Sequence, residues 1–362
     1  MKNPAQNLYY ADYLGLNSLL NAQHPESAKR GTPAHDEILF IITHQTFELW
    51  FKQILYELNS IQQLFGKAPI SEQDLYTIVS RLGRIVKIQK LVNQQFQVLE
   101  SMTALDFLDF RDDLTPASGF QSRQFREIEI RLGLAQNIKA VNFGRFNAPD
   151  QSHLDQVAKQ ESLFELLDRW LSRMPFLKFG SFDFWKSYHD AVDDMLKQDS
   201  EIIRSNPFLN EIEKSTQLRE LAQTRECFEC LFDAERYRDQ QMQGSFRLKH
   251  ASVLSALFIT LYRDEPMLQL PFELLTRLMD IDEELSSWRN GHAVMVHRMV
   301  GKKIGTGGSS GHDYLKATID RQRIFADLFN SSTFLIPRSV LPKLPPAVKR
   351  ELGFSKPRDP ID

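Results

Sequence analysis

The sequence predicts an all-α protein built as a bundle of long helices. Gly and Pro number only 16 each among 362 residues, so the residues that interrupt helices are scarce. Apolar residues recur at helical spacing along several long segments, and no segment between turn signals shows the sustained alternation typical of a half-buried strand. With 42% hydrophobic residues the chain can bury a sizeable core. We therefore expect a single domain over residues 1–362 and no sheet.

The composition excludes several classes of protein. The 44 basic and 47 acidic residues leave a formal net charge of -3, which is not the charge of a nucleic-acid-binding domain. Two cysteines cannot form the disulfide framework of a small secreted protein. No run of about 18 apolar residues predicts a membrane helix, and residues 1–10 carry no apolar signal-peptide core. We expect a soluble, cytoplasmic protein.

The first long helix is predicted over residues 33–65. Thr32 is a plausible N-cap, and Pro33 is tolerated at the first helical position. Asp36 and Glu37 suit the positive end of the helix dipole. A glycine and a proline shortly after residue 65 end the helix.

A second long helix is predicted to begin at Ser71, with Asp74 as a carboxylate variant of the capping box. Its apolar residues keep a heptad-like spacing that Gln89 alone interrupts, which indicates packing against another long helix. These apolar positions are Leu75, Ile78, Leu82, Ile85, Val92, Phe96 and Leu99.

Further helical patterns cover the rest of the chain. The best candidate for an insertion or a variable, mobile helical region is about 195–245, which is highly charged and poor in large aliphatic residues. The predicted helices are about 122–135, 157–173, 182–204, 210–240, 248–262, 271–301 and 313–331.

Cys227 and Cys230 form a C-x-x-C pair inside one of these helical patterns. A redox motif of this kind normally needs a βαβ context, and a zinc site needs two further ligands nearby. Neither is present, so we interpret both as ordinary helix residues and leave a redox role open.

The run of residues 305–311, Gly-Thr-Gly-Gly-Ser-Ser-Gly, is the most unusual segment. It matches neither a dinucleotide fingerprint, which needs Gly at position 310 and a preceding strand, nor a P-loop. Four glycines are costly to order in a purely structural turn. Backbone N–H groups and hydroxyls in such a loop would suit a carboxylate or another anion. A ligand loop and a structural turn both remain open here.

Two of the nine histidines, His44 and His292, lie inside long apolar helices. No H-E-x-x-H motif occurs, and no Glu stands three residues before any His, so zinc and di-iron spacings are absent. A histidine on an apolar face is usually a hydrogen-bonded core residue. The alternative for this pair in an all-α protein is a haem site.

Arg111 also has two interpretations. It stands four residues after Phe107, on the same face of a helix, after an alternation of aromatic and charged residues. It could be a solvated arginine paired with Asp109 or Asp112. It could also be a guanidinium clamp beside an aromatic wall, which would fit an amino-acid carboxylate.

Taken together, the motifs resemble those of the tryptophan 2,3-dioxygenase family. The matching blocks keep the family's order and cover most of the chain outside about 135–245. They are residues 10–14 (YADYL), 35–37 (HDE) through 50–53 (WFKQ), 102–107 (MTALDF), 116–122 (PASGFQS), 278–282 (LMDID), 288–292 (WRNGH), 305–311 and 334–338 (FLIPR).

This resemblance implies an all-α fold that holds haem b between helices, assembled as a homotetramer that is a dimer of dimers. The implied reaction inserts both atoms of O2 across the indole C2–C3 bond of L-tryptophan and gives N-formyl-L-kynurenine. His292 is implied as the axial ligand of the haem iron, and His44 as the catalytic residue near the indole N–H. Residues 1–30 are implied to form an arm that reaches the active site of a neighbouring subunit. The residues implied at the substrate are Tyr10, Tyr13, Phe40, His44, Phe107, Arg111, Ser118, Gly119 and Thr306.

Two other functions fit the same residues. One is a related haem dioxygenase that prefers a substituted tryptophan, and the other is a helical protein that binds haem or tryptophan without turnover. The sequence also predicts a close contact at Gly291, because glycine costs roughly 1 kcal/mol within a helix. We expect the haem or a neighbouring helix to approach it.

Overall fold

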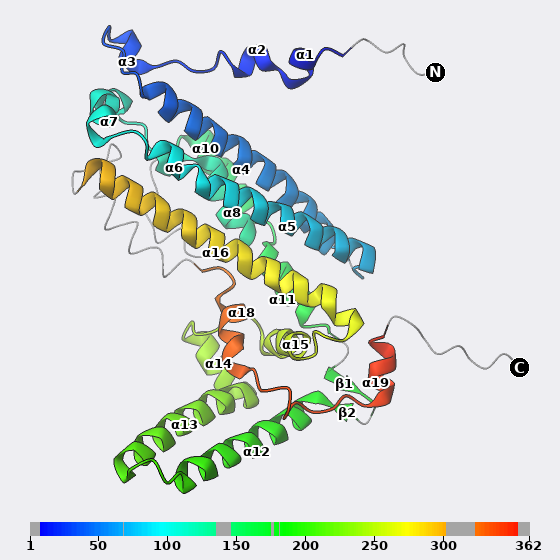
Figure 1. Ribbon diagram of the computed structural model, residues 1–362. Coiled ribbons are helices and arrows are strands. Elements are labelled where there is room, and N and C mark those ends of the chain that lie inside the picture. The colour runs from blue at the N-terminus through cyan, green and yellow to red at the C-terminus, as the bar shows by residue number, and fades with distance from the viewer. Residues whose placement is uncertain are drawn as a thin grey trace, which may run out of the picture. The chain divides into compact units, whose positions relative to one another are not determined.

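The computed structural model describes residues 8–67, 69–134, 146–174, 177–180, 182–301 and 323–353. Within these ranges the chain is almost entirely helical, which confirms the predicted all-α class (Figure 1). One small exception is a two-stranded antiparallel hairpin of β1 (Lys178–Phe179) and β2 (Phe182–Asp183). The expectation of no sheet was therefore wrong at this hairpin. Its connection includes Gly180 at φ 59°, a left-handed conformation that favours glycine.

The chain divides into two compact units. The first comprises residues 1–58, 85–160 and 283–323, and the second comprises 59–84, 161–282 and 324–362. Three of the five boundaries fall inside long helices, namely α4 (Glu37–Phe65), α5 (Glu72–Gln94) and α16 (Pro266–Val300). The single domain expected from the sequence stays a prediction.

In the first unit, portions of α4, α5 and α16 lie alongside one another, joined by short helices (Figure 1). Aromatic contacts between Phe47 on α4, Phe96 on α6 and Trp288 on α16 bring these three helices together, with ring centroids 4.5–5.7 Å apart. The shorter elements are α1 (Tyr10–Leu14), α2 (Leu16–Leu19), α3 (Glu26–Lys29), α6 (Phe96–Leu99), α7 (Ala104–Arg111), the 3-10 helices η1 (Asp112–Leu114) and η2 (Gly119–Gln121), α8 (Arg123–Leu132) and α10 (Ala148–Val157).

In the second unit, α12 and α13 form an antiparallel helical hairpin that α14 follows (Figure 1). Residues 195–245, singled out in the sequence, fall on these three helices and the turns beside them. The elements are α11 (Leu163–Leu171), α12 (Phe184–Ser205), α13 (Glu211–Phe232), α14 (Ala234–Met242), α15 (His250–Leu261), α18 (Ala326–Asn330), the 3-10 helix η4 (Ser331–Phe334) and α19 (Pro346–Glu351).

The start of α4 differs from the prediction, because the helix begins at Glu37 and Thr32 is not its N-cap. Glu37 is buried, and its carboxylate accepts hydrogen bonds from the backbone N–H groups of Glu26 (2.7 Å) and Ser27 (3.0 Å). Glu37 therefore fastens the N-terminal segment to α4. This tertiary contact, and not the helix dipole alone, explains a glutamate at this position.

The predicted seam of the second helix is confirmed, although its C-terminal part is a separate element. Ser71 accepts a hydrogen bond from the backbone N–H of Asp74 (3.0 Å) and donates its hydroxyl to that carboxylate (2.8 Å), as the capping motif predicts. The helix α5 ends at Gln94, and the last two seam residues, Phe96 and Leu99, are the buried residues of α6. All seven apolar seam positions are buried, and so is Gln89.

Three other boundaries also differ from the sequence-based expectation. The helix predicted over 157–173 begins at Leu163, because Ser162 and Glu165 form a capping box there. The helix predicted over 210–240 is two helices, since Asp233 accepts hydrogen bonds from the N–H groups of Glu235 and Arg236 and caps α14. The helix α16 begins at Pro266, five residues before the predicted start. Most of the helix predicted over 313–331 lies outside the described residues.

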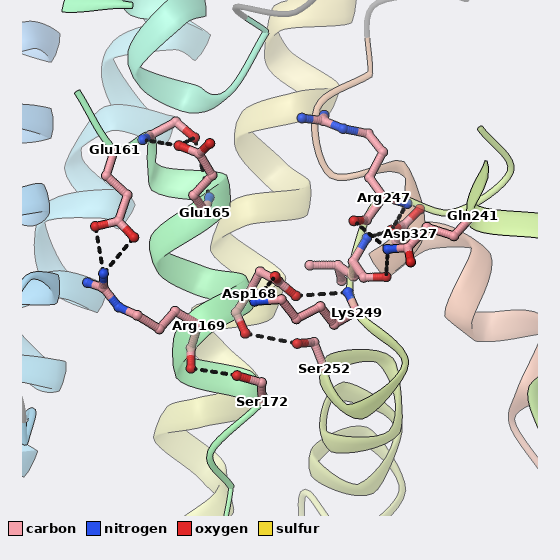
Figure 2. A network of polar contacts seen from close by, with 12 residues as sticks. Glu161, Glu165, Asp168, Arg169, Ser172, Gln241, Arg247, Lys249, Ser252 and Asp327 are labelled. Atoms are coloured by element: carbon pink, nitrogen blue, oxygen red, sulfur yellow. Dashed lines mark hydrogen bonds and ion pairs between the residues drawn. The ribbon is translucent and has the colours of Figure 1, made fainter. Parts of the chain in front are cut away.

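Buried carboxylates connect the helices of the second unit (Figure 2). Asp168 on α11 accepts a hydrogen bond from the backbone N–H of Lys249 (2.9 Å), and its carbonyl accepts the hydroxyl of Ser252 (2.8 Å). Asp327 on α18 accepts the backbone N–H of Arg247 (2.7 Å). These bonds fix the segment that leads into α15 from both sides.

Across the described residues, we find no helix that combines the length and the apolar character required to cross a membrane.

Candidate functional site

The helix α7 presents Phe107 and Arg111 one turn apart. It begins at a capping box in which Thr103 accepts the backbone N–H of Asp106 and Asp106 accepts the backbone N–H of Thr103 (2.9 Å). This cap fixes the first residue of the helix and therefore the direction of its later side chains. Phe110 is fully buried, whereas Phe107 and Arg111 are half-buried.

Three of the expected site residues are brought together between α4 and α7. The ring of Phe40 lies 4.1 Å from that of His44 and 5.7 Å from that of Phe107, measured between centroids. Phe110 closes the cluster, with its centroid 5.6 Å from Phe40 and 5.4 Å from Phe107. The result is an aromatic wall with one imidazole in it.

His44 is held in a defined tautomer. Its Nδ1 lies 2.7 Å from the carbonyl oxygen of Phe40. Because a carbonyl oxygen only accepts, Nδ1 must carry the hydrogen and Nε2 is left as an acceptor. Burial lowers the pKa of His44, although the Phe40 carbonyl and the charge of Glu48 act in the opposite direction. A neutral imidazole with an accepting Nε2 is suited to bind an N–H group.

Phe40 and His44 form part of the wall of a cavity of about 560 Å³ in the first unit. This volume is within the range of small-molecule sites. Within the described chain, neither Phe107 nor Arg111 lines the cavity. The other lining residues are Leu19, Ala22, His24, Glu26, Glu37, Ile41, Gln45, Glu48, Leu49, Lys52, Leu114 and Gln124.

Arg111 makes a loose ion pair with Asp112, with 3.6 Å between the guanidinium nitrogen and the carboxylate. The Arg111 side chain is 15% exposed, and the Asp112 side chain is 87% exposed. Asp113, by contrast, pairs with Arg30 at 2.9 Å. An ion pair with so exposed a carboxylate is weak.

Ser118 and Gly119 lie at the start of η2, where Ser118 caps the turn in a box with Gln121. Glu48, a residue to which the sequence assigned no role, fixes the segment that follows. Its carboxylate accepts the hydroxyl of Ser122 (2.6 Å) and the amide of Gln124 (2.8 Å). Because Glu48 is one turn after His44 on α4, it links this loop to the helix of the aromatic cluster.

His292 lies on α16 between aromatic rings. Its ring is nearly parallel to that of Trp288, at 6° and 6.4 Å, and its centroid is 6.3 Å from that of Phe96. Burial lowers the pKa of His292 to about 4, and the neighbouring His44 and the charge of Arg126 act in the same direction. The imidazole is therefore neutral at pH 7 and can serve as a metal ligand.

Gly291 allows this close packing, as the sequence predicted. A Cβ atom added there would lie 3.2 Å from the ring of Phe96, which is tighter than ordinary contact. The helix that approaches Gly291 closely is therefore α6, through the ring of Phe96.

A buried ionic group supports the same part of α16. Glu129 on α8 accepts hydrogen bonds from Arg126 (2.6 Å) and from Arg289 (2.9 Å). Arg289 stands three residues before His292 on α16. Burial alone would raise the pKa of Glu129, but the two guanidinium groups hold it below its ordinary value. Arg289 lies inside a motif block that the sequence singled out, yet its partner is 160 residues away in the chain.

The remaining predicted residues are not brought to this cluster within the described chain. Tyr10 and Tyr13 lie on α1 and are 70% and 71% exposed. Thr306 and the rest of the 305–311 run lie outside the described residues. No group of three or more His, Cys, Asp or Glu side chains able to hold a metal ion occurs in the part that the structure describes.

Comparison with known proteins identifies relatives along the whole chain. The family model described as tryptophan 2,3-dioxygenase matches residues 2–335. A tryptophan 2,3-dioxygenase of Alteromonas mediterranea is 49% identical over 359 residues, covering 98% of this chain and 99% of the relative. That of Bdellovibrio bacteriovorus is 48% identical with the same coverage. That of Mus musculus is 43% identical over 353 residues, covering 95% and 86% of the two chains.

Proposed function

Because the chain belongs to the tryptophan 2,3-dioxygenase family, we propose that it inserts both atoms of O2 across the indole C2–C3 bond of L-tryptophan. The product is N-formyl-L-kynurenine, and the reaction is the first step of tryptophan catabolism. The observation that carries the proposal at the site is the aromatic cluster of Phe40, His44 and Phe107, in which one neutral imidazole stands in a wall of rings.

His292 is suited to hold a haem. It is a single neutral imidazole among aromatic rings, in a region where the described residues offer no multi-ligand metal site. A haem needs only such an axial ligand from the protein, because the porphyrin supplies the equatorial ones. When bound, haem b would supply the ferrous iron that activates dioxygen.

The protein's own residues act mainly by placing the substrate. The rings of Phe40 and Phe107 suit a flat indole, because aromatic faces and edges pack favourably at these separations. The Nε2 atom of His44 is suited to accept the indole N–H, since its Nδ1 hydrogen is already bound to the Phe40 carbonyl. His44 thus orients the ring and needs no change of protonation to do so.

The amino-acid end of the substrate is assigned to Arg111, Ser118, Gly119 and Thr306. Arg111 can bind the carboxylate through two parallel hydrogen bonds, the geometry that a planar guanidinium favours. The capped turn at Ser118 presents a hydroxyl and a glycine backbone close to the chain that Glu48 fixes. Thr306 is assigned by its place in the 305–311 run alone.

We further propose that the protein is a homotetramer, built as a dimer of dimers, in which Tyr10 and Tyr13 reach the site of a neighbouring subunit. Their exposure supports this arrangement, because a contiguous group of exposed apolar side chains often marks a protein–protein contact. Tyr10 and Tyr13 are accompanied on this segment by the exposed side chains of Leu8, Tyr9 and Leu14.

The test is aerobic incubation of the haem-loaded, reduced protein with L-tryptophan while the absorbance of N-formylkynurenine is recorded. We expect product to form only with reduced haem and with both substrates present. A parallel assay with ring-substituted tryptophans would show whether one of them is preferred. Tight binding of haem and L-tryptophan without any product would contradict the proposal and would favour a binding protein.

A further inference from the structure

The second unit contains a cavity of about 770 Å³, separate from the aromatic cluster, whose wall includes both cysteines of the chain. Cys227 and Cys230 lie in the last two turns of α13, and α14 and the 330–334 segment complete the wall. Most of the lining side chains are polar or charged, among them Glu226, Arg236 and Asp239.

Neither cysteine is buried in the core of its unit. On the same turns of α13, Phe228 and Leu231 are buried. Cys227 is exposed, Cys230 is half-buried, and neither is in a disulfide. A cysteine that is not disulfide-bonded is among the most buried residue types in proteins. Packing therefore does not explain why thiols occupy these two positions.

The Cα atoms of the two cysteines are held at a separation within the range found in disulfides. Residues three apart in an α-helix have Cα atoms about 5 Å apart, as follows from the rise and radius of the helix. Disulfides join residues whose Cα atoms are roughly 4.4–6.8 Å apart. The Cβ atoms of residues three apart on a helix are about 5–6 Å apart, whereas a disulfide holds them about 3.5–4.5 Å apart. The last turns of α13 must therefore tighten locally for the sulfur atoms of Cys227 and Cys230 to meet, close to the point where the helix ends at Phe232.

The surroundings distinguish the two thiols. Burial raises the pKa of Cys230, and the charge of Cys227 acts in the same direction, while Arg236 opposes them. Cys227 is also the more exposed of the two residues. The raised pKa of Cys230 keeps its thiol protonated. This division is typical of an attacking and a resolving cysteine.

We propose that Cys227 and Cys230 form a reversible dithiol site that low-molecular-weight disulfides oxidise to an intrahelical disulfide. The Cys227 thiolate attacks one sulfur of the disulfide, forms a mixed disulfide and releases the first thiolate. Cys230 then loses its proton to solvent, and its sulfur attacks the sulfur of Cys227 and releases the second thiolate. Two electrons pass from the cysteine pair to the small disulfide, which is reduced to two thiols.

The site does not depend on the proposed dioxygenase reaction, and the chain offers a clean test. Since it has only two cysteines, every thiol lost or modified belongs to this pair. The full-length holoenzyme is incubated anaerobically with oxidised glutathione and then alkylated with iodoacetamide, and its mass is measured. We expect the wild type to lose both alkylation sites while retaining no glutathione, and reduced glutathione in excess to restore both.

Single variants separate the two steps. Cys230→Ser should accumulate one glutathione on Cys227, because the resolving thiol is absent. Cys227→Ser should react more slowly than Cys230→Ser, and circular dichroism establishes that both variants are folded. A wild-type protein that keeps two alkylatable thiols, or that carries two glutathiones, would overturn the proposal. Equal rates for the two variants would overturn the assignment of Cys227 as the attacking thiol.

Discussion

The carboxylate of Glu129 on α8 lies 2.9 Å from the guanidinium group of Arg289 on α16, and both side chains are at most 5% exposed. Arg289 is one turn before His292, so this bond joins α8 to the part of α16 that carries the proposed haem ligand. Arg126 binds the same carboxylate at 2.6 Å. Because the three charges are buried together, removing Glu129 would take the shared counter-charge away from both buried guanidinium groups.

Glu129→Gln should therefore destabilise the protein strongly. A buried ion pair that loses one partner costs about 3–5 kcal/mol, since the guanidinium groups stay buried without their counter-charge. Urea denaturation of the wild type and the variant measures this difference in the free energy of unfolding. The matched control is Glu161→Gln, whose Arg169 partner lies at 2.6 Å but at the surface, with both side chains more than a third exposed (Figure 2). The control should cost about 1 kcal/mol or less, and equal costs would refute the role of burial.

The contribution of Glu129 should also depend on pH. Because Arg126 and Arg289 hold the pKa of Glu129 below its ordinary value of 4.5, the folded state favours the charged carboxylate. The stabilisation is complete above pH 4.5 and is lost as the pH falls through the lower folded-state pKa. The gap in unfolding free energy between wild type and Glu129→Gln should thus be constant from pH 7 to about 5 and shrink towards pH 3. A gap that widened on acidification would contradict this sign.

Local sequence patterns were sufficient to predict the buried residues where a helix packs by one continuous face. The heptad-like spacing from Leu75 to Leu99 predicts the buried face of α5 and α6, and every apolar position on it is buried. The glycine at 291 predicts a close neighbour, which is Phe96. One local signal was overlooked, because Ser162 and Glu165 have capping-box spacing and do start α11.

Contacts between distant segments could not be predicted in this way. The start of α4 depends on Glu37 binding the N–H groups of residues 26 and 27, and no helix signal records that contact. The same holds for Glu129 and Arg289, which are separated by 160 residues. The site residues were expected from a resemblance of motifs, whereas the distances between Phe40, His44 and Phe107 depend on how α4 and α7 pack.

His292→Ala should abolish haem binding. The substitution removes the only side chain assigned to the iron, and the aromatic rings of Phe96 and Trp288 offer no ligand in its place. The Soret band of protein reconstituted with haem is the measurement, and we expect it to disappear. His297→Ala is the control, because His297 is five residues further and about 140° around the same helix. Normally ligated haem in His292→Ala would refute the axial assignment.

Arg111→Ala should raise KM for L-tryptophan by about 10²- to 4 × 10³-fold. An arginine–carboxylate pair with one partner removed loses about 3–5 kcal/mol, and each 1.4 kcal/mol is a factor of ten. Steady-state kinetics with L-tryptophan measures the change. Asp112→Asn decides between the two interpretations of Arg111, because it removes the loose ion pair and leaves the guanidinium in place. If Asp112→Asn raised KM as much as Arg111→Ala, the role of Arg111 would be structural.

His44→Ala should lower kcat/KM without abolishing turnover. A hydrogen bond between neutral groups contributes about 0.5–1.5 kcal/mol, so the loss of the accepting Nε2 should cost roughly two- to tenfold. His44→Phe separates this bond from packing, because a phenyl ring can still fill the space beside Phe40 and Phe47. Similar losses in both variants would support orientation of the indole N–H by Nε2. Full activity in His44→Phe would show that the ring serves only to pack the aromatic wall. Complete inactivity of both variants, with haem and L-tryptophan still bound, would instead make His44 an obligatory proton-transfer group.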